Sequence, residues 1–158
     1  MKLPYFEGSV FCLPLRDTGF ARGVVARATK RGKVLFAYFF GPRLRSKEVV
    51  KLDDLHPENA IFCSKFGDLG LINGEWTMHG KVPEWNRAEW PMPDFVTCDP
   101  LGFLKPRLVR YSDIDLFRTE AAYWIDDDRG LPTDSVAGSG AVERRMTNLL
   151  KAAPNDRN

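Results

Sequence analysis

Residues 9–40, SVFCLPLRDTGFARGVVARATKRGKVLFAYFF, decide the fold, because they hold three apolar runs separated by two turn sequences. Arg-Asp-Thr-Gly at 16–19 places Asp and Gly where a β-hairpin needs them, and Lys-Arg-Gly-Lys at 30–33 forms the next turn. The last run, 34–40, shows no polar alternation, which indicates a central strand covered on both faces and ended by Gly41-Pro42. An antiparallel meander is therefore predicted.

The rest of the chain extends this pattern of short strands. Further strands are expected at 60–66, 76–80, 95–98, 108–111 and 114–117, while 121–125 could extend a strand or begin a helical turn. Ser139 is expected to cap a terminal helix that ends near residue 152 and packs through one apolar stripe: Val142, Met146, Leu149 and Leu150. The predicted fold is α+β and predominantly antiparallel β. It is a strongly bent sheet of about five to eight strands, or a partly open small barrel, with a C-terminal helix.

Length and composition predict a single domain over residues 1–158, with a core at about 7–152 and a frayed tail at 153–158. No run approaches the roughly 20 apolar residues of a membrane span, and no signal-peptide core opens the chain, so we expect a cytoplasmic protein without a membrane partner. Three cysteines, Cys12, Cys63 and Cys98, lie far apart, which favours free thiols over disulfides or a metal site. No cofactor is expected.

Charge is unevenly distributed along the chain, although the net charge is only +2. Residues 1–52 hold eleven Lys or Arg against three acids, a balance of +8, and residues 53–158 hold twelve against eighteen, a balance of −6. The two halves therefore either form a basic and an acidic face or interleave in the sheet and mix their charges. A basic face would suit a small-barrel nucleic-acid-binding regulator, with Phe20, Tyr38 or Phe40 to stack on bases. Its cations would be Arg22, Arg27, Lys30, Arg31, Lys33, Arg43, Arg45, Lys47 and Lys51.

The motifs of common enzymes are absent from the sequence. It has no phosphate-binding glycine loop, no paired-histidine zinc helix and no close cysteine pair, so an active site would have to be assembled from scattered residues. Asp126, Asp127 and Asp128, here called the acidic run, lack the alternate spacing of a calcium loop. They are expected to form an exposed loop that is either simply solvated or an epitope for a basic partner. Trp85 and Trp90, in a proline-rich loop, are further candidates for a partner surface.

Four short elements follow one another in a recognisable order: EGSVFCLPL at 7–15, GFARGVV at 19–25, GEWTMHG at 74–80 and PDF at 93–95. Over about residues 7–118 they resemble the immunity protein 26 family of bacterial polymorphic toxin systems. The resemblance implies a non-enzymatic, cytoplasmic protein that neutralises a cognate toxin by binding it. It assigns a framework role, in the core or in turns, to Gly8, Phe11, Pro14, Gly23, Gly74, Trp76, Gly80, Pro93 and Phe95. A nucleic-acid-binding regulator is the alternative function.

Overall fold

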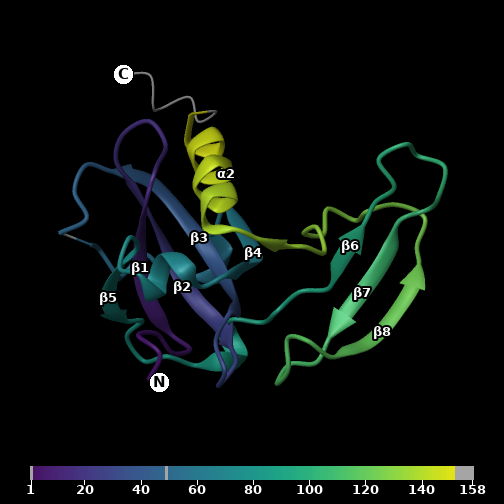
Figure 1. Ribbon diagram of the computed structural model, residues 1–158, viewed down its shortest axis with the longest axis horizontal. Coiled ribbons are helices and arrows are strands. Elements are labelled where there is room, and N and C mark those ends of the chain that lie inside the picture. The colour runs from purple at the N-terminus through teal and green to yellow at the C-terminus, as the bar shows by residue number, and fades with distance from the viewer. Residues whose placement is uncertain (1, 49, 152–158) are drawn as a thin grey trace.

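The computed structural model describes residues 2–48 and 50–151, which form two β-sheets and a C-terminal helix (Figure 1). The strands are β1 (Ser9–Pro14), β2 (Phe20–Ala28), β3 (Val34–Leu44), β4 (Phe62–Gly67), β5 (Thr77–Lys81), β6 (Phe95–Thr97), β7 (Arg107–Tyr111), β8 (Thr119–Trp124) and β9 (Val136–Ala137). The helices are α1 (Leu69–Ile72), α2 (Ser139–Lys151) and two short 3-10 turns, Pro57–Asn59 and Arg87–Glu89. The tail expected at 153–158 lies outside the described residues.

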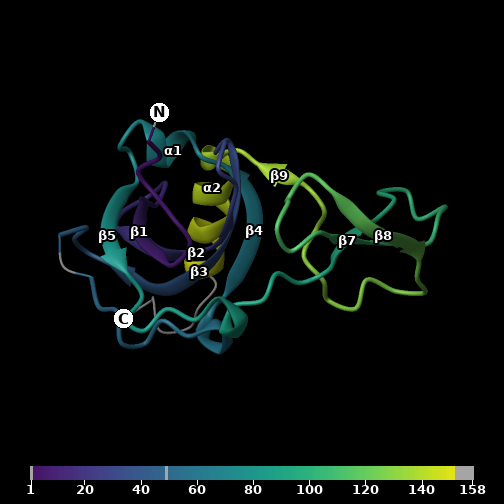
Figure 2. The ribbon, with the colours of Figure 1, turned by 90° about the horizontal axis from the view of Figure 1, so that it is seen from below.

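The first sheet has six strands in the order β5-β1-β2-β3-β4-β9. All its neighbours are antiparallel except β4 and β9, which run parallel. The sheet curls around α2 without closing, since β5 and β9 remain its two ends (Figure 2). The prediction of a strongly bent, mainly antiparallel sheet with a C-terminal helix is confirmed. No helix within the described ranges is long and apolar enough to cross a membrane.

The concave face of this sheet packs against α2. Phe11, Phe39, Phe66 and Trp76 form an aromatic cluster there. From the helix, Val142, Met146 and Leu150 are buried in the same core and Leu149 is partly buried, so the predicted apolar stripe is confirmed. A methyl group on Gly23 would lie 2.2 Å from the Phe11 ring, so only glycine lets that ring cross β2.

The convex face is covered by loops rather than by a helix. Phe36 and Phe40 of β3 are buried there, beneath side chains that the connections and the second sheet supply: Leu55, Val82, Trp90, Phe95 and Leu116. The residues of β3 therefore point alternately into two apolar layers. This arrangement confirms the prediction that 34–40 is a central strand covered on both faces.

Gly41-Pro42 does not end β3, which continues to Leu44. The pairs Arg22↔Phe40 and Phe20↔Leu44 leave one residue of β2 opposite three of β3. Such a bulge accommodates proline, because the residues inside it are released from the regular ladder of hydrogen bonds.

Two further local predictions are wrong. Residues 114–117 form the turn between β7 and β8 instead of a strand, because Asp115 accepts a hydrogen bond from the Phe117 amide (2.9 Å) in a side-chain-stabilised turn. Ser139 is the first residue of α2 rather than its cap. The Gly138 carbonyl accepts the first helical hydrogen bond, from the Val142 amide (3.1 Å).

The second sheet, with the order β6-β7-β8, was not anticipated, since the sequence suggested a single sheet. It is antiparallel and lies beside the first sheet, as Figures 1 and 2 show. Its own core is small and consists of Val96, Leu108 and Ile125, with Leu131 packed against them. Most of its surface is therefore left to solvent.

Candidate partner-binding surface

The acidic run lies at the far end of the second sheet, directly after β8, and all three residues are exposed. Asp127 and Asp128 accept hydrogen bonds from the amides of Arg129 and Gly130, at 2.9 and 3.0 Å, and so shape the turn that leaves the sheet. Asp126 is 93% exposed and pairs with Lys105 at 3.0 Å. The run is therefore an exposed turn with three carboxylates, one of which pairs with a lysine.

Large apolar side chains are exposed on the same sheet and on its connecting loops. They are Leu101, Phe103, Leu104, Ile114, Phe117, Tyr123 and Trp124. Trp124, the last residue of β8, is 60% exposed, and Tyr123 beside it is 43% exposed. Ile114 and Phe117 lie in the turn at the opposite end of the sheet from the acidic run, whereas Trp124 and the exposed apolar side chains of the loop before β7 lie at the same end as the run. Isolated exposed apolar residues are ordinary, but several beside a charged turn are typical of a binding surface.

A buried lysine joins the second sheet to the first. The Lys65 ammonium, on β4, donates to Asp134 Oδ1 (2.8 Å) and lies 3.7 Å from the centroid of the Tyr111 ring, on β7. The Tyr111 hydroxyl donates to the same carboxylate oxygen at 2.8 Å. Burial, together with this hydrogen bond, raises the pKa of Tyr111 to about 12. Lys65, Asp134 and Tyr111 thus form a charged joint between the two sheets. Because each charged group in it has a partner, no unpaired charge is buried there.

A second charged joint fixes the turn between β7 and β8. Arg27, on β2, donates to Asp113 Oδ1 (2.8 Å) and to the Trp90 carbonyl (2.9 Å). Arg87 also donates to Asp113 and, at 2.8 Å, to Glu7. Burial acts to raise the pKa of Asp113, but hydrogen bonds from the two guanidinium groups hold it below its ordinary value. The two joints together hold the second sheet in a defined position.

Trp90 is not a surface residue, so the expectation that it faces a partner is wrong. Its side chain is 2% exposed and packs edge-on against Tyr38 and Phe40. The proline-rich loop folds back over the convex face because Arg27 and Tyr38 bind the carbonyls of Trp90 and Pro91. Trp85 is half-buried, packs against Trp90 with the ring centroids 5.6 Å apart and the rings tilted by 34°, and covers Gly8. Gly8 has φ +94 and no room for a side chain.

The remaining framework positions divide between core and turns. Phe11, Trp76 and Phe95 are fully buried, and Gly23 lies beneath the Phe11 ring. The Trp76 indole N–H also donates to Glu143 Oε2, on α2, at 2.8 Å. Pro14 ends β1, Gly74 lies in a turn with φ +81, Gly80 lies in the edge strand β5, and Pro93 lies in the loop before β6.

A family model for Immunity protein 26 matches residues 6–105. The chain belongs to this immunity protein family. No curated protein and no solved structure matches it. All nine framework positions fall inside the matched range, whereas β7, β8 and the acidic run follow it in the chain. The matched range therefore covers β1 to β6, whereas β9, α2 and the exposed edge of the second sheet lie beyond it.

The basic first half of the chain does not form one continuous surface. Arg22 and Arg27 are buried, and each is paired with an acid from the second half, Asp54 and Asp113 respectively. Phe40, a proposed base-stacking residue, belongs to the core. The charges of the two halves thus mix, as expected for an antiparallel sheet. Exposed cations remain in two places: Lys30, Arg31 and Lys33 at the turn between β2 and β3, and Arg45, Lys47 and Lys51 in the segment after β3.

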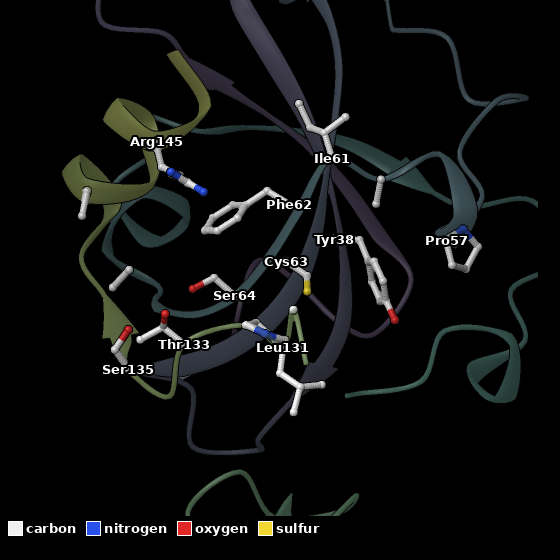
Figure 3. Close-up of a pocket in the computed structure, with 15 residues that line it drawn as sticks. Tyr38, Pro57, Ile61, Phe62, Cys63, Ser64, Leu131, Thr133, Ser135 and Arg145 are labelled. Atoms are coloured by element: carbon white, nitrogen blue, oxygen red, sulfur yellow. The ribbon is translucent and has the colours of Figure 1, made fainter. Parts of the chain in front are cut away.

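A groove of about 770 Å³ separates β4 from the chain that returns from the second sheet (Figure 3). Tyr38, Cys63, Leu131 and Arg145 line it. Burial raises the pKa of the Cys63 thiol to about 11, so the thiol is protonated and unreactive at neutral pH. Within the described ranges no group of acids, histidines and cysteines is placed to hold a metal. The hydroxyl groups of Ser64, Thr133 and Ser135 line the same groove.

Proposed function

We propose that this protein neutralises a toxin in the bacterial cytoplasm by binding it, and that it catalyses no reaction itself. The observation that supports this most strongly is the match to the Immunity protein 26 family over residues 6–105. A toxin made by the same bacterium would be bound before it reached its target. Tight, specific binding is sufficient for such protection, and it requires a preformed surface rather than an active site.

The acidic run and the exposed aromatic residues of β8 are the binding surface that we favour. Trp124 and Tyr123, which point to opposite faces of the sheet at its open edge, can each serve as an anchor that loses water when a partner covers it. The carboxylates nearby would attract a basic toxin surface and speed association. A toxin that acts on nucleic acid needs such a basic surface for its own substrate.

The position of this surface in the chain also supports the proposal. Members of one immunity family can share a framework and still face different toxins, and partner choice then requires surfaces that differ between members. The framework positions lie within 6–105, while β8 and the acidic run lie outside that range. Specificity for one toxin would accordingly reside in the second sheet.

The test is to express the toxin domain encoded next to this protein's gene, with and without the protein, and to purify the two together. We expect growth to be restored and a stable complex to form. Protection without a complex, or with a covalent change in the toxin detected by mass spectrometry, would contradict the proposal. Binding of oligonucleotides at near-physiological salt, lost on charge reversal of Lys30, Arg31 and Lys33, would instead favour a nucleic-acid-binding regulator.

A further inference from the structure

Strand β8 is a free edge of the second sheet. In the order β6-β7-β8 it pairs with β7 on one side, and no strand of the described ranges pairs with its other side. Its six residues, Thr119–Trp124, are all exposed or half-exposed. Figure 1 shows β8 as the outermost strand, directed away from the first sheet.

The hydrogen bonds of β8 show which of its backbone groups are free. The Ile125 amide donates to the Pro106 carbonyl at 2.9 Å, and Trp124 is opposite Arg107 in the register. Backbone groups of successive residues in an antiparallel strand point alternately to the two sides. Tyr123 therefore points its N–H and C=O toward β7, and Ala122 and Trp124 point theirs outward. The one register shift with β7 lies at the other end of β8, beyond Ala121.

This edge carries little of the usual protection against pairing. Exposed edges of natural sheets are commonly blocked by charged residues, proline, a bulge or a covering segment. In β8, TEAAYW, the one charged residue, Glu120, and the register shift with β7 lie near the start of the strand. The small side chains of Ala121 and Ala122 leave the backbone open nearer the acidic run. An unprotected edge in a water-soluble chain is a candidate site for strand addition from another protein.

The charge next to this edge indicates which kind of strand would add. The acidic run begins two residues after the end of β8, and its three carboxylates have Lys105 as their one salt-bridge partner within the described ranges. A strand lying along β8 would pass Trp124 and end beside these carboxylates. An extended segment with basic residues at that end would satisfy both the backbone and the charges.

We infer that β8 accepts an extended, basic strand of the toxin, which extends the second sheet by main-chain hydrogen bonds and places cationic side chains against the acidic run. The inference rests on the proposed function and adds the site and the mode of binding. The two charged joints at Lys65 and Asp113 hold the edge in place before the toxin arrives. Such preorganisation lowers the entropic cost of binding.

Ala122→Pro is the sharpest test. Proline removes the outward N–H of Ala122 but no hydrogen bond to β7, and edge strands tolerate it in that orientation. Ala122→Thr is the matched control, because threonine suits a strand and keeps the N–H. We expect circular dichroism and melting temperature to be close to wild type for both variants. Affinity for the neighbouring toxin domain should fall about tenfold or more for Ala122→Pro and stay within about threefold for Ala122→Thr.

Hydrogen exchange gives a second measurement that does not depend on a variant. In the free protein the amides of Ala122 and Trp124 should exchange quickly and that of Tyr123 slowly, and toxin should protect the first two. Toxin binding by Ala122→Pro at wild-type affinity, or fast exchange of both outward amides in the complex, would overturn strand addition while leaving the proposed function intact. Absence of any complex with the wild-type protein would refute the proposed function itself. Self-association of the free protein that Ala122→Pro abolishes, with toxin binding unchanged, would assign the edge to a second copy and also overturn the inference.

Discussion

Truncating Trp76 to alanine tests how the framework holds the bent sheet and its helix together. The indole is 1% exposed, and its ring lies 5.4 Å from the rings of both Phe11 and Phe66. It also donates the hydrogen bond to Glu143 that ties the start of β5 to α2. One substitution thus removes an aromatic contact on the sheet and a polar contact with the helix.

The expected loss can be divided between these two contacts. Removing a buried Trp side chain costs about 3–5 kcal/mol, because the apolar area is lost and the cavity collapses only in part. Glu143 keeps Arg16 as a partner at 3.1 Å, so losing the indole donor adds only about 1 kcal/mol. Trp76→Ala should therefore destabilise the protein by about 4–6 kcal/mol. Trp76→Phe keeps an aromatic ring in the core and should cost only about 1–2 kcal/mol.

Urea denaturation followed by circular dichroism measures both losses, since the midpoint and slope together give the free energy of unfolding. Trp85→Ala is the control on the other face, where a half-buried indole should cost less than Trp76→Ala. An unchanged midpoint for Trp76→Ala, or equal losses for the alanine and phenylalanine variants, would refute the view that Trp76 stabilises chiefly by packing in the core.

Three more perturbations address the surface, the joint between the sheets and the buried thiols. Replacing the three residues of the acidic run by asparagine should leave the melting temperature nearly unchanged. It should slow association with the toxin and make the association rate depend less on salt concentration. An unchanged association rate would exclude the run from the interface. Lys65→Met should lower the free energy of unfolding by about 3 kcal/mol, because it leaves the buried Asp134 carboxylate with one hydrogen-bond partner. Adding Asp134→Asn should recover part of that loss in chemical denaturation. Additive losses from the two substitutions would show that the two residues are not coupled. Burial raises the pKa of the Cys12 and Cys63 thiols from 9.0 to about 11. Between pH 9 and 11 the thiols are therefore deprotonated in the unfolded chain but protonated in the folded one. The free energy of unfolding should fall as pH rises through this range. Replacing both cysteines by alanine should reduce that fall, as melting curves across this pH range can show; an identical fall would exclude the thiols as its cause.

The first sheet could be predicted because its information is local. The turns at 16–19 and 30–33 carry their own glycine and polar residues, and the unbroken apolar run at 34–40 marks a strand covered on both sides. The helix could be predicted for the same reason, from one stripe of apolar side chains. The start of α2 and the end of β3 were misplaced because a backbone carbonyl can replace a side-chain cap and a bulge can contain a proline.

The second sheet and the position of Trp90 depend on contacts between distant residues. Lys65 meets Asp134 across 69 positions, and Arg27 meets Asp113 across 86. Neither pair leaves a periodic signal in the sequence. Trp90 appeared to lie in an exposed loop because prolines dominate its neighbourhood, yet a buried arginine that binds its carbonyl turns the loop inward. The exposure of the acidic run was predicted correctly, but the free edge of β8 beside it was not. A free edge follows from the strand order of the folded sheet, and no local pattern in the sequence indicates that order.

Under the proposed function, stability and recognition are separated in this molecule by the placement of its two sheets. The first sheet buries its aromatic residues on both faces, so substitutions there act mainly on folding. The second sheet has a core of three buried residues and would be weak alone, but Lys65 and Arg27 connect it to the larger core through paired charges. The second sheet can therefore leave the outer side of β8 unpaired and Trp124 exposed, because its position does not depend on either. A partner strand would then meet a preformed edge whose side chains can vary between family members while the framework that supports it stays the same.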